Sequence, residues 1–250
     1  MDLKQKIIII FGICLILCLG AYIIITNLFE NIESQLIERY RVEAKLGAKG
    51  SGELMNFMIE TNLLTEAALF DRNYREIPGS SPAMYSTNYD ILFEKYIQDF
   101  QDEFLRVDKD LVYSAVVDIN GYAPTHNSNY SQPPRKDMQY NLRYSRAKRK
   151  FDDNVGLRAA RYIGTGTLEQ LYTRDTGEII WDIAAPVKLK GKHWGAFRVG
   201  VSMGSIQELK NHMLLTIVLS IFIIISITLL MVFLIIPRKL IDTDIITTKY

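Results

Sequence analysis

Two long uncharged runs dominate the hydrophobic pattern of this chain. Ile7 to Ile25 holds 19 residues without a charge, and Met213 to Ile236 holds 24. A helix rising about 1.5 Å per residue needs roughly 20 such residues to cross about 30 Å of hydrocarbon. The pattern therefore predicts two transmembrane helices, at residues 7–26 and 213–236, with a segment of 27–212 between them.

The first run has one alternative interpretation, a cleaved signal peptide. Lys4 and Lys6 would form its basic start, but the run exceeds the usual apolar length and no A-x-A cleavage site ends it. We therefore expect a retained anchor. Basic residues flank both outer ends of the pair, since Arg238 and Lys239 follow the second run. The positive-inside rule then predicts that residues 1–6 and 237–250 are cytoplasmic and that residues 27–212 lie outside.

Strand-like patterns fill the second half of the segment between the runs. Leu168–Val201 reads as three consecutive antiparallel strands, with reversals at Asp175-Thr176-Gly177 and Lys190-Gly191-Lys192. In the middle strand Trp181, Ile183 and Ala185 alternate with Ile180, Asp182 and Ala184, so each set faces one side of the sheet. Leu111–Asp118 is a further strand, and Asn120-Gly121 predicts a hairpin in which Tyr122–Thr125 run back beside it.

Helical periodicity marks the remaining parts. Leu28–Phe57 predicts a long amphipathic helix leaving the membrane, in which Gly47, Gly50 and Gly52 indicate either a kink or close packing. Asn88–Leu105 carries an aromatic stripe and predicts a second helix. Shorter segments are expected to form a helix at residues 63–70, a loop at 71–87, a helical or irregular stretch at 138–151 and a helix at 155–163. Five antiparallel strands fronted by a long N-terminal helix make an α+β module.

Composition excludes several classes of chemistry. The formal net charge of +1 is uninformative about partners, and the few basic clusters are local. We expect no nucleic-acid partner. Cys14 and Cys18 both lie in the first apolar run, so residues 27–212 have no disulfide, thiolate metal site or C-x-x-C-H haem attachment. P-loop, G-x-S-x-G and H-E-x-x-H motifs are missing, and the three histidines are scattered. We therefore predict no enzyme, no metal site and no cofactor.

Four spaced motifs resemble one bacterial family. They are DRNYREIPG at residues 71–79, DINGYAPTHN at 118–127, KRKFDDNVGLRAAR at 148–161, and YTRDTGE at 172–178 followed by His193-Trp-Gly195. Together they resemble the periplasmic sensor of methyl-accepting chemotaxis proteins, a single Cache domain with a PAS-like sheet. The resemblance covers roughly residues 27–236.

The resemblance implies a homodimeric chemoreceptor in the bacterial inner membrane. Its periplasmic sheet would bind a small molecule, and the second transmembrane helix would pass the signal to a HAMP linker and a methylated helical hairpin. Here Pro237-Arg-Lys-Leu240 resembles only the start of a HAMP segment, and 14 residues follow Ile236. We expect a truncated receptor, a separate signalling chain that supplies the output, or a relic.

The turn region Asp118–Asn127 is the first candidate binding site. Asp118 would ordinarily satisfy backbone groups of the turn. Tyr122, His126 and Asn127, however, combine an aromatic ring, an imidazole and an amide within six residues, a mixture that suits a small polar ligand. His126 would also titrate near physiological pH.

Arginines form the second candidate site. Residues 143–150 are basic and are expected to form a solvated face. Arg158 and Arg161 instead stand in apolar surroundings three residues apart, which suits recognition of a carboxylate, although they could equally pair with Asp152, Asp153 or Asp182. Asp182 is either a pocket group or an inward ion-pair partner, and the same two alternatives apply to Arg198 one strand later. Tyr172 could close the pocket with its hydroxyl. The predicted ligand-binding residues are Tyr113, Asp118, Tyr122, His126, Asn127, Arg158, Arg161, Tyr172 and Asp182.

These observations predict a membrane-anchored sensor of a small, anionic ligand. A haem- or redox-linked sensor is the alternative of a different class, with only His126 or His193 available as haem ligands. A receptor that keeps only a structural role is the third interpretation.

Overall fold

The computed structural model describes residues 3–235 and divides them into two compact units. One unit contains the chain up to Gln35 and from Gln207 onward, and the other is Leu36–Ile206. The fold is α+β, with a long N-terminal helix and a four-stranded antiparallel sheet, as the sequence predicted. The predicted tail at 237–250, including the HAMP-like start, lies outside the described residues.

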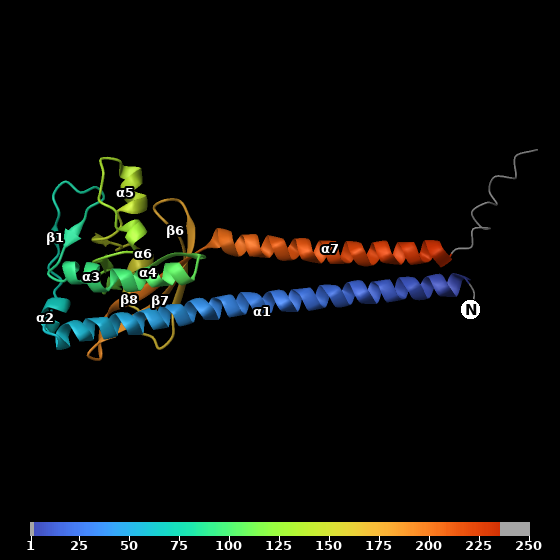
Figure 1. The fold of residues 1–250 in the computed structure, drawn as a ribbon, viewed down its shortest axis with the longest axis horizontal. Helices are drawn as coiled ribbons and strands as arrows, with labels where there is room; N and C mark the ends of the chain where they lie inside the picture. Colours follow the sequence, from blue (N-terminus) through green and yellow to red (C-terminus); the bar gives the residue numbers. More distant parts are fainter. Residues whose placement is uncertain (1–2, 236–250) are drawn as a thin grey trace, which may run out of the picture. The chain divides into compact units, whose positions relative to one another are not determined.

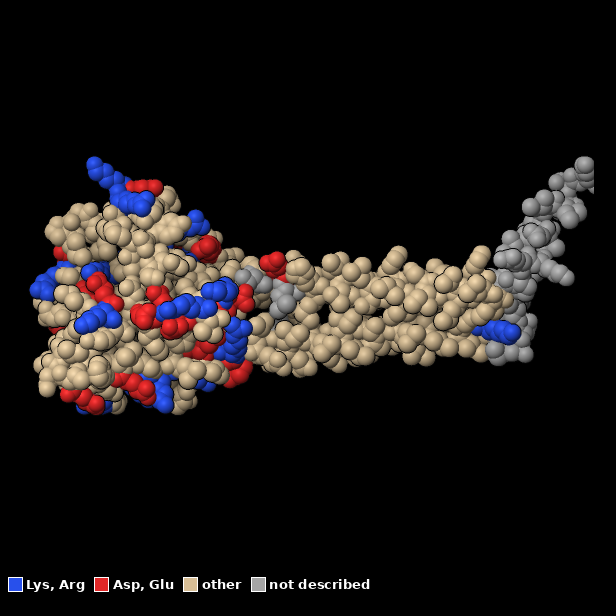
Figure 2. Space-filling view, in the orientation of Figure 1, with Lys and Arg blue, Asp and Glu red and all other residues tan. Residues whose placement is uncertain are grey.

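Two helices are long and apolar enough to cross a membrane. They are α1 (Leu3–Glu60) and α7 (Met203–Ile235), which contain the two predicted apolar runs as far as residue 235. Most of their large apolar side chains are exposed, as lipid contact would require. Figure 2 shows charged atoms gathered on the unit Leu36–Ile206, while the visible apolar stretches are almost uncharged.

The predicted amphipathic helix is confirmed as the continuation of α1, without an interruption at its glycines. A Cβ on Gly47 would lie 2.1 Å from Cε1 of Phe197, and one on Gly50 would lie 2.4 Å from Cζ of Phe100. At Gly52 the nearest atom would be the carbonyl oxygen of Lys188, at 2.7 Å. The glycines therefore permit close packing, and the kink is the alternative that the structure does not show.

The main sheet has the strand order β3-β8-β7-β6, and all its neighbours are antiparallel. Its strands are β3 (Leu111–Asp118), β6 (Leu168–Thr173), β7 (Ile179–Leu189) and β8 (Lys192–Ser202). The last three form the predicted meander. Lys190 and Gly191 have φ values of 50° and 79°, so a two-residue turn joins β7 to β8, as the Gly-containing sequence predicted.

The predicted hairpin after Asn120-Gly121 is wrong in its pairing. Strand β4 (Tyr122–Ala123) forms its ladder with β5 (Arg149–Lys150) rather than with β3. The main sheet consequently has four strands, not five, and β1 (Arg75–Glu76) pairs separately with β2 (Tyr85–Ser86). Gly121 still reverses the chain, with φ 75°, but the returning residues leave the sheet and cover it.

Short helices surround the sheet. The predicted helix at 88–105 is two helices, α3 (Asp90–Tyr96) and α4 (Gln98–Val107), which run end to end in Figure 1. The remaining helices are α2 (Glu66–Leu69), the 3-10 turn η1 (Ser128–Tyr130), α5 (Met138–Tyr144) and α6 (Asn154–Ala160).

The largest core lies between α1, α3, α4 and one face of the sheet. Fully buried members include Tyr40 and Met55 of α1, Phe93 of α3, and Ile183 and Phe197 of the sheet. The opposite face has a smaller apolar cluster, in which Ala159 and Ala160 of α6 pack against Val117, Ala184 and Ala196. This second face, away from α1, also carries the buried charges described next.

Candidate functional site

A pocket lies on the sheet face opposite α1, and we call it the Arg198 pocket. Strand alternation brings Tyr113, Tyr172 and Arg198 to this face from three different strands. Its two adjoining cavities, of ≈ 20 Å³ and ≈ 480 Å³, share Arg146, Phe151, Tyr172 and Arg198. The smaller cavity is also lined by Tyr113, Ala115, Val117 and His126.

A buried ion pair forms the floor of the pocket. Nε of Arg198 donates to the two carboxylate oxygens of Asp182 at 3.0 and 3.2 Å, and the Tyr113 hydroxyl donates to Oδ1 at 2.6 Å. The side chain of Asp182 is 0% exposed and that of Arg198 is 6% exposed. Burial alone would lower the pKa of Arg198, but Asp182 and Tyr113 outweigh it and raise the pKa. Of the two alternatives for Asp182, the structure shows the inward ion-pair partner.

Three further guanidinium groups surround the floor. Arg146 and Arg149 donate to the two oxygens of Asp175 at 2.7 and 3.0 Å, and Arg174 donates to Glu178 at 2.9 Å. Burial and the charge of Arg174 lower the pKa of Arg146. Burial acts to raise the pKa of Asp175, but Arg146 and Arg149 outweigh it and lower the pKa.

These arginines correct the expectation of a solvated basic face. Arg146 is 4% exposed and Arg149 is 9% exposed, because the segment between α5 and α6 folds over the sheet. Arg174 and Arg198 are equally buried, at 5% each. The signal in the sequence was the position of Arg198, which has the right alternation to share a face with Asp182 on the neighbouring strand.

His126 stands beside these guanidinium groups. Its Nδ1 accepts the backbone N–H of Asn127 at 2.9 Å, and its ring contacts the rings of Tyr113 and Tyr130. Burial and the charges of Arg146, Arg174, Arg149 and Arg198 hold the pKa of His126 well below its ordinary value of 6.5. The imidazole is therefore neutral at pH 7, with its proton on Nε2.

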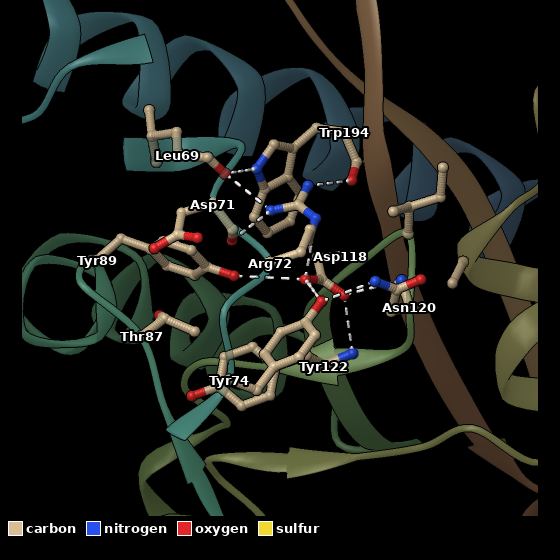
Figure 3. Close-up of polar contacts among 12 residues, drawn as sticks. Leu69, Asp71, Arg72, Tyr74, Thr87, Tyr89, Asp118, Asn120, Tyr122 and Trp194 are labelled. Carbon is tan, nitrogen blue, oxygen red and sulfur yellow. Dashed lines mark hydrogen bonds and ion pairs between the residues drawn. The ribbon is translucent and has the colours of Figure 1, made fainter. Parts of the chain in front are cut away.

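Two predicted site residues, Asp118 and Tyr122, lie in a different cluster, which Figure 3 shows. Asp118 is fully buried and accepts from the Tyr74 hydroxyl at 2.5 Å, with Nε of Arg72 at 3.3 Å. Its other oxygen accepts the backbone N–H groups of Asn120 and Tyr122 at 2.9 and 3.0 Å. Asp118 points away from the Arg198 pocket because its position in β3 has the opposite alternation to Tyr113.

The Asp118 cluster fastens the segment after α2 to the sheet. Nε1 of Trp194 donates to the Leu69 carbonyl at 2.7 Å, and an Arg72 guanidinium N–H reaches the Trp194 carbonyl at 3.3 Å (Figure 3). The Tyr122 hydroxyl lies 2.9 Å from both oxygens of Asp90. Asp118 therefore satisfies backbone N–H groups of the turn, as expected of a turn residue, and also binds side chains of a distant segment.

The remaining predicted residues also lie outside the pocket lining. Asn127 is fully buried, where its Oδ1 accepts the backbone N–H of Ser114 at 2.9 Å. Arg158 and Arg161 are exposed, because α6 turns Ala159 and Ala160 toward the sheet. Arg161 reaches the Ile119 carbonyl at 3.4 Å. Of the predicted residues, the structure brings together Tyr113, His126, Tyr172 and Asp182.

No group of three or more His, Cys, Asp and Glu side chains within residues 3–235 is placed to hold a metal ion. In comparisons with known proteins, no family model and no curated protein matches the chain.

Proposed function

We propose that this chain is a membrane-anchored sensor that binds a small anionic ligand in the Arg198 pocket. The observation that carries the proposal is the set of three buried guanidinium groups, those of Arg146, Arg149 and Arg198, that line the two adjoining cavities. Guanidinium groups recognise carboxylates through paired, charge-assisted hydrogen bonds, and burial strengthens such bonds. The apolar walls supplied by Ala115, Val117 and Phe151 suit a small organic molecule.

The arrangement also supports the Cache-like interpretation. A long helix packs on one face of an antiparallel sheet, and the polar pocket occupies the other face. In this proposal α1 and α7 span the bacterial inner membrane, and the unit Leu36–Ile206 lies in the periplasm as one half of a homodimeric chemoreceptor.

Signal transfer would begin at β8. Arg198 lies four residues before the end of β8 at Ser202, and α7 begins at the next residue, Met203. A ligand that contacts Arg198 acts on the strand that continues directly into the second membrane helix. It would shift the equilibrium only if it bound one arrangement of this strand better than the other.

The test uses the full chain in lipid nanodiscs and a panel of small anions that includes acetate, lactate, pyruvate, succinate and phosphate. Binding is followed by calorimetry and by the fluorescence of Trp181 and Trp194, the two tryptophans of the chain. The test variant, Asp182→Leu with Arg198→Met, removes both charges of the buried pair. Its matched control, Arg158→Gln with Arg161→Gln, removes two exposed charges.

We expect at least one anion to bind the natural chain and the control, and to bind the test variant at least about 100-fold more weakly. Equal affinity for both variants would place the site elsewhere, and no binding by any anion would refute the sensor proposal. Topology is tested separately with Lys136→Cys, at an exposed position. An impermeant maleimide should label it in spheroplasts, and labelling only after lysis would refute the periplasmic placement.

A further inference from the structure

We propose that the Arg198 pocket selects a small carboxylic acid without an ammonium group and rejects the amino acid of the same shape. This inference rests on the proposed function, because it names the chemical class of the ligand for the same site. The inference follows from two observations. The nearby carboxylates already accept hydrogen bonds from arginines, whereas several guanidinium N–H groups have no acceptor.

Each buried arginine of this region is paired with a carboxylate. Asp182 accepts from Arg198 and from the Tyr113 hydroxyl, and Asp175 accepts from Arg146 and Arg149. Glu178 accepts from Arg174 at 2.9 Å and from the Thr176 hydroxyl at 3.0 Å. An ammonium group entering the pocket would therefore compete with a buried arginine for each of these acids.

Unused donors, by contrast, remain on two of these arginines, of which Arg149 lines the larger cavity. Nη1 of Arg149 and both Nε and Nη2 of Arg174 are buried without a hydrogen-bond partner among the described residues. A buried donor without an acceptor is unfavourable, and an anionic oxygen relieves it best. Among the buried guanidinium groups of the lining, Arg146 and Arg149 share the single carboxylate of Asp175, which leaves one surplus positive charge for a ligand carboxylate to neutralise.

His126 completes the set of donors. Its Nδ1 is occupied by the N–H of Asn127, so the ring offers the pocket an Nε2 proton and no lone pair. The two tyrosine hydroxyls, those of Tyr113 and Tyr172, can accept a hydrogen bond but carry no charge. The lining of the smaller cavity thus includes no side chain that offers a free negative charge to an ammonium group.

Besides Asp175, the lining of the larger cavity includes two more acids, Asp152 and Asp153. Both are exposed, and Oδ1 of Asp153 already accepts the backbone N–H of Gly156 at 2.8 Å. Exposed charges are weakened by water and salt, so they do not compensate for the buried guanidinium groups of the lining. The smaller cavity, of ≈ 20 Å³, admits a group about the size of one water molecule, which favours a short ligand.

The experiment compares acids that differ only by a hydroxyl or an ammonium group, with the full chain in lipid nanodiscs. The pairs are glycolate with glycine, L-lactate with L-alanine, and L-malate with L-aspartate, measured by calorimetry and by thermal shift. We expect at least one hydroxy acid to bind and its amino partner to bind at least about 100-fold more weakly, since an uncompensated buried charge costs that much or more.

Two variants test the role of His126. His126→Gln keeps an N–H donor, and we expect the affinity for the hydroxy acid to stay within about 10-fold of the natural value. His126→Leu removes the donor and should weaken binding by about 10-fold or more. Tryptophan fluorescence during thermal unfolding shows whether each variant is folded. If His126→Leu is unfolded, a loss of affinity of more than about 10-fold in folded His126→Gln would still contradict the role of an N–H donor at this position.

The outcomes separate this inference from the proposed function. An amino acid that binds as tightly as its hydroxy acid would overturn the selectivity and leave the anion sensor intact. Binding of phosphate but of none of the organic acids would overturn the carboxylic acid assignment alone. If no anion of either panel binds, the proposed function itself fails.

Discussion

The buried pair of Asp182 and Arg198 makes the sharpest prediction about stability. Asp182→Leu would leave the Arg198 guanidinium, whose side chain is 6% exposed, without its carboxylate and the Tyr113 hydroxyl without its acceptor. Removing one partner of a buried pair costs about 3–5 kcal/mol, because the remaining charge stays out of water. We therefore expect the free energy of unfolding to fall by about that amount.

The double variant, Asp182→Leu with Arg198→Met, separates lost charge from lost packing. Replacing both charges with apolar groups of similar volume is often neutral, so this variant should be about 2 kcal/mol more stable than Asp182→Leu alone. A remaining cost of about 1–3 kcal/mol is expected for the Tyr113 hydroxyl, which loses its acceptor. As a control, Glu53→Leu breaks the exposed Lys49 pair, at 3.7 Å, and should change stability by less than about 1 kcal/mol.

Urea unfolding in detergent micelles, followed by tryptophan fluorescence, measures these differences. Trp181 and Trp194 both lie in the unit Leu36–Ile206, so the signal reports on the sheet and not on the membrane helices. A loss below about 1 kcal/mol in Asp182→Leu would show that water reaches Arg198. A double variant no more stable than the single one would refute the argument that the uncompensated charge causes the loss.

Three other changes test separate parts of the structure. Asp118→Asn weakens the contacts with Arg72 and Tyr74 and should lower the free energy of unfolding by about 3 kcal/mol or more. The affinity of the Arg198 pocket for its ligand should change by less than about threefold, and a large loss of affinity in a folded variant would contradict the separation of the two sites. Since the folded pKa of His126 lies well below 6.5, the unfolded chain binds more protons than the folded chain around and below pH 6.5, so stability falls as the pH falls, by about 1 kcal/mol between pH 6.5 and 5.5. Urea unfolding of His126→Gln at the same pH values should lack this share of the slope, and an identical slope would refute it. Gly47→Ala should destabilise the protein by about 1–3 kcal/mol in thermal unfolding, because contact with the buried Phe197 ring outweighs the helix-propensity gain of about 1 kcal/mol. The control is Lys49→Ala, at an exposed position of the same helix, and a stabilised Gly47→Ala would contradict the close packing.

The local pattern of apolar and polar residues was sufficient to predict most of the helices and strands. The three strands of Leu168–Val201, the strand Leu111–Asp118 and the long helix were predicted from periodicity alone, because burial on one face imposes a repeat on the sequence. The two apolar runs likewise depend only on length and composition. Alternation also assigned Asp182 to the face opposite Trp181 and Ile183, which the structure confirms.

The site depended on contacts between distant segments. The sequence favoured Arg158 and Arg161 because their neighbours are apolar, yet helix α6 uses its two alanines to contact the sheet and leaves both arginines exposed. Arg146 and Arg149 belong to a charged run, which ordinarily faces solvent, and they are buried because Asp175 from the turn between β6 and β7 neutralises them. The pairing of β4 with β5 places this segment over the sheet, and nothing local in Tyr122–Ala123 selects that partner.

Sequence alone thus determined the elements and their faces, since these follow from local periodicity. The tertiary structure decided which charges are buried together, since that depends on which distant segments cover each face.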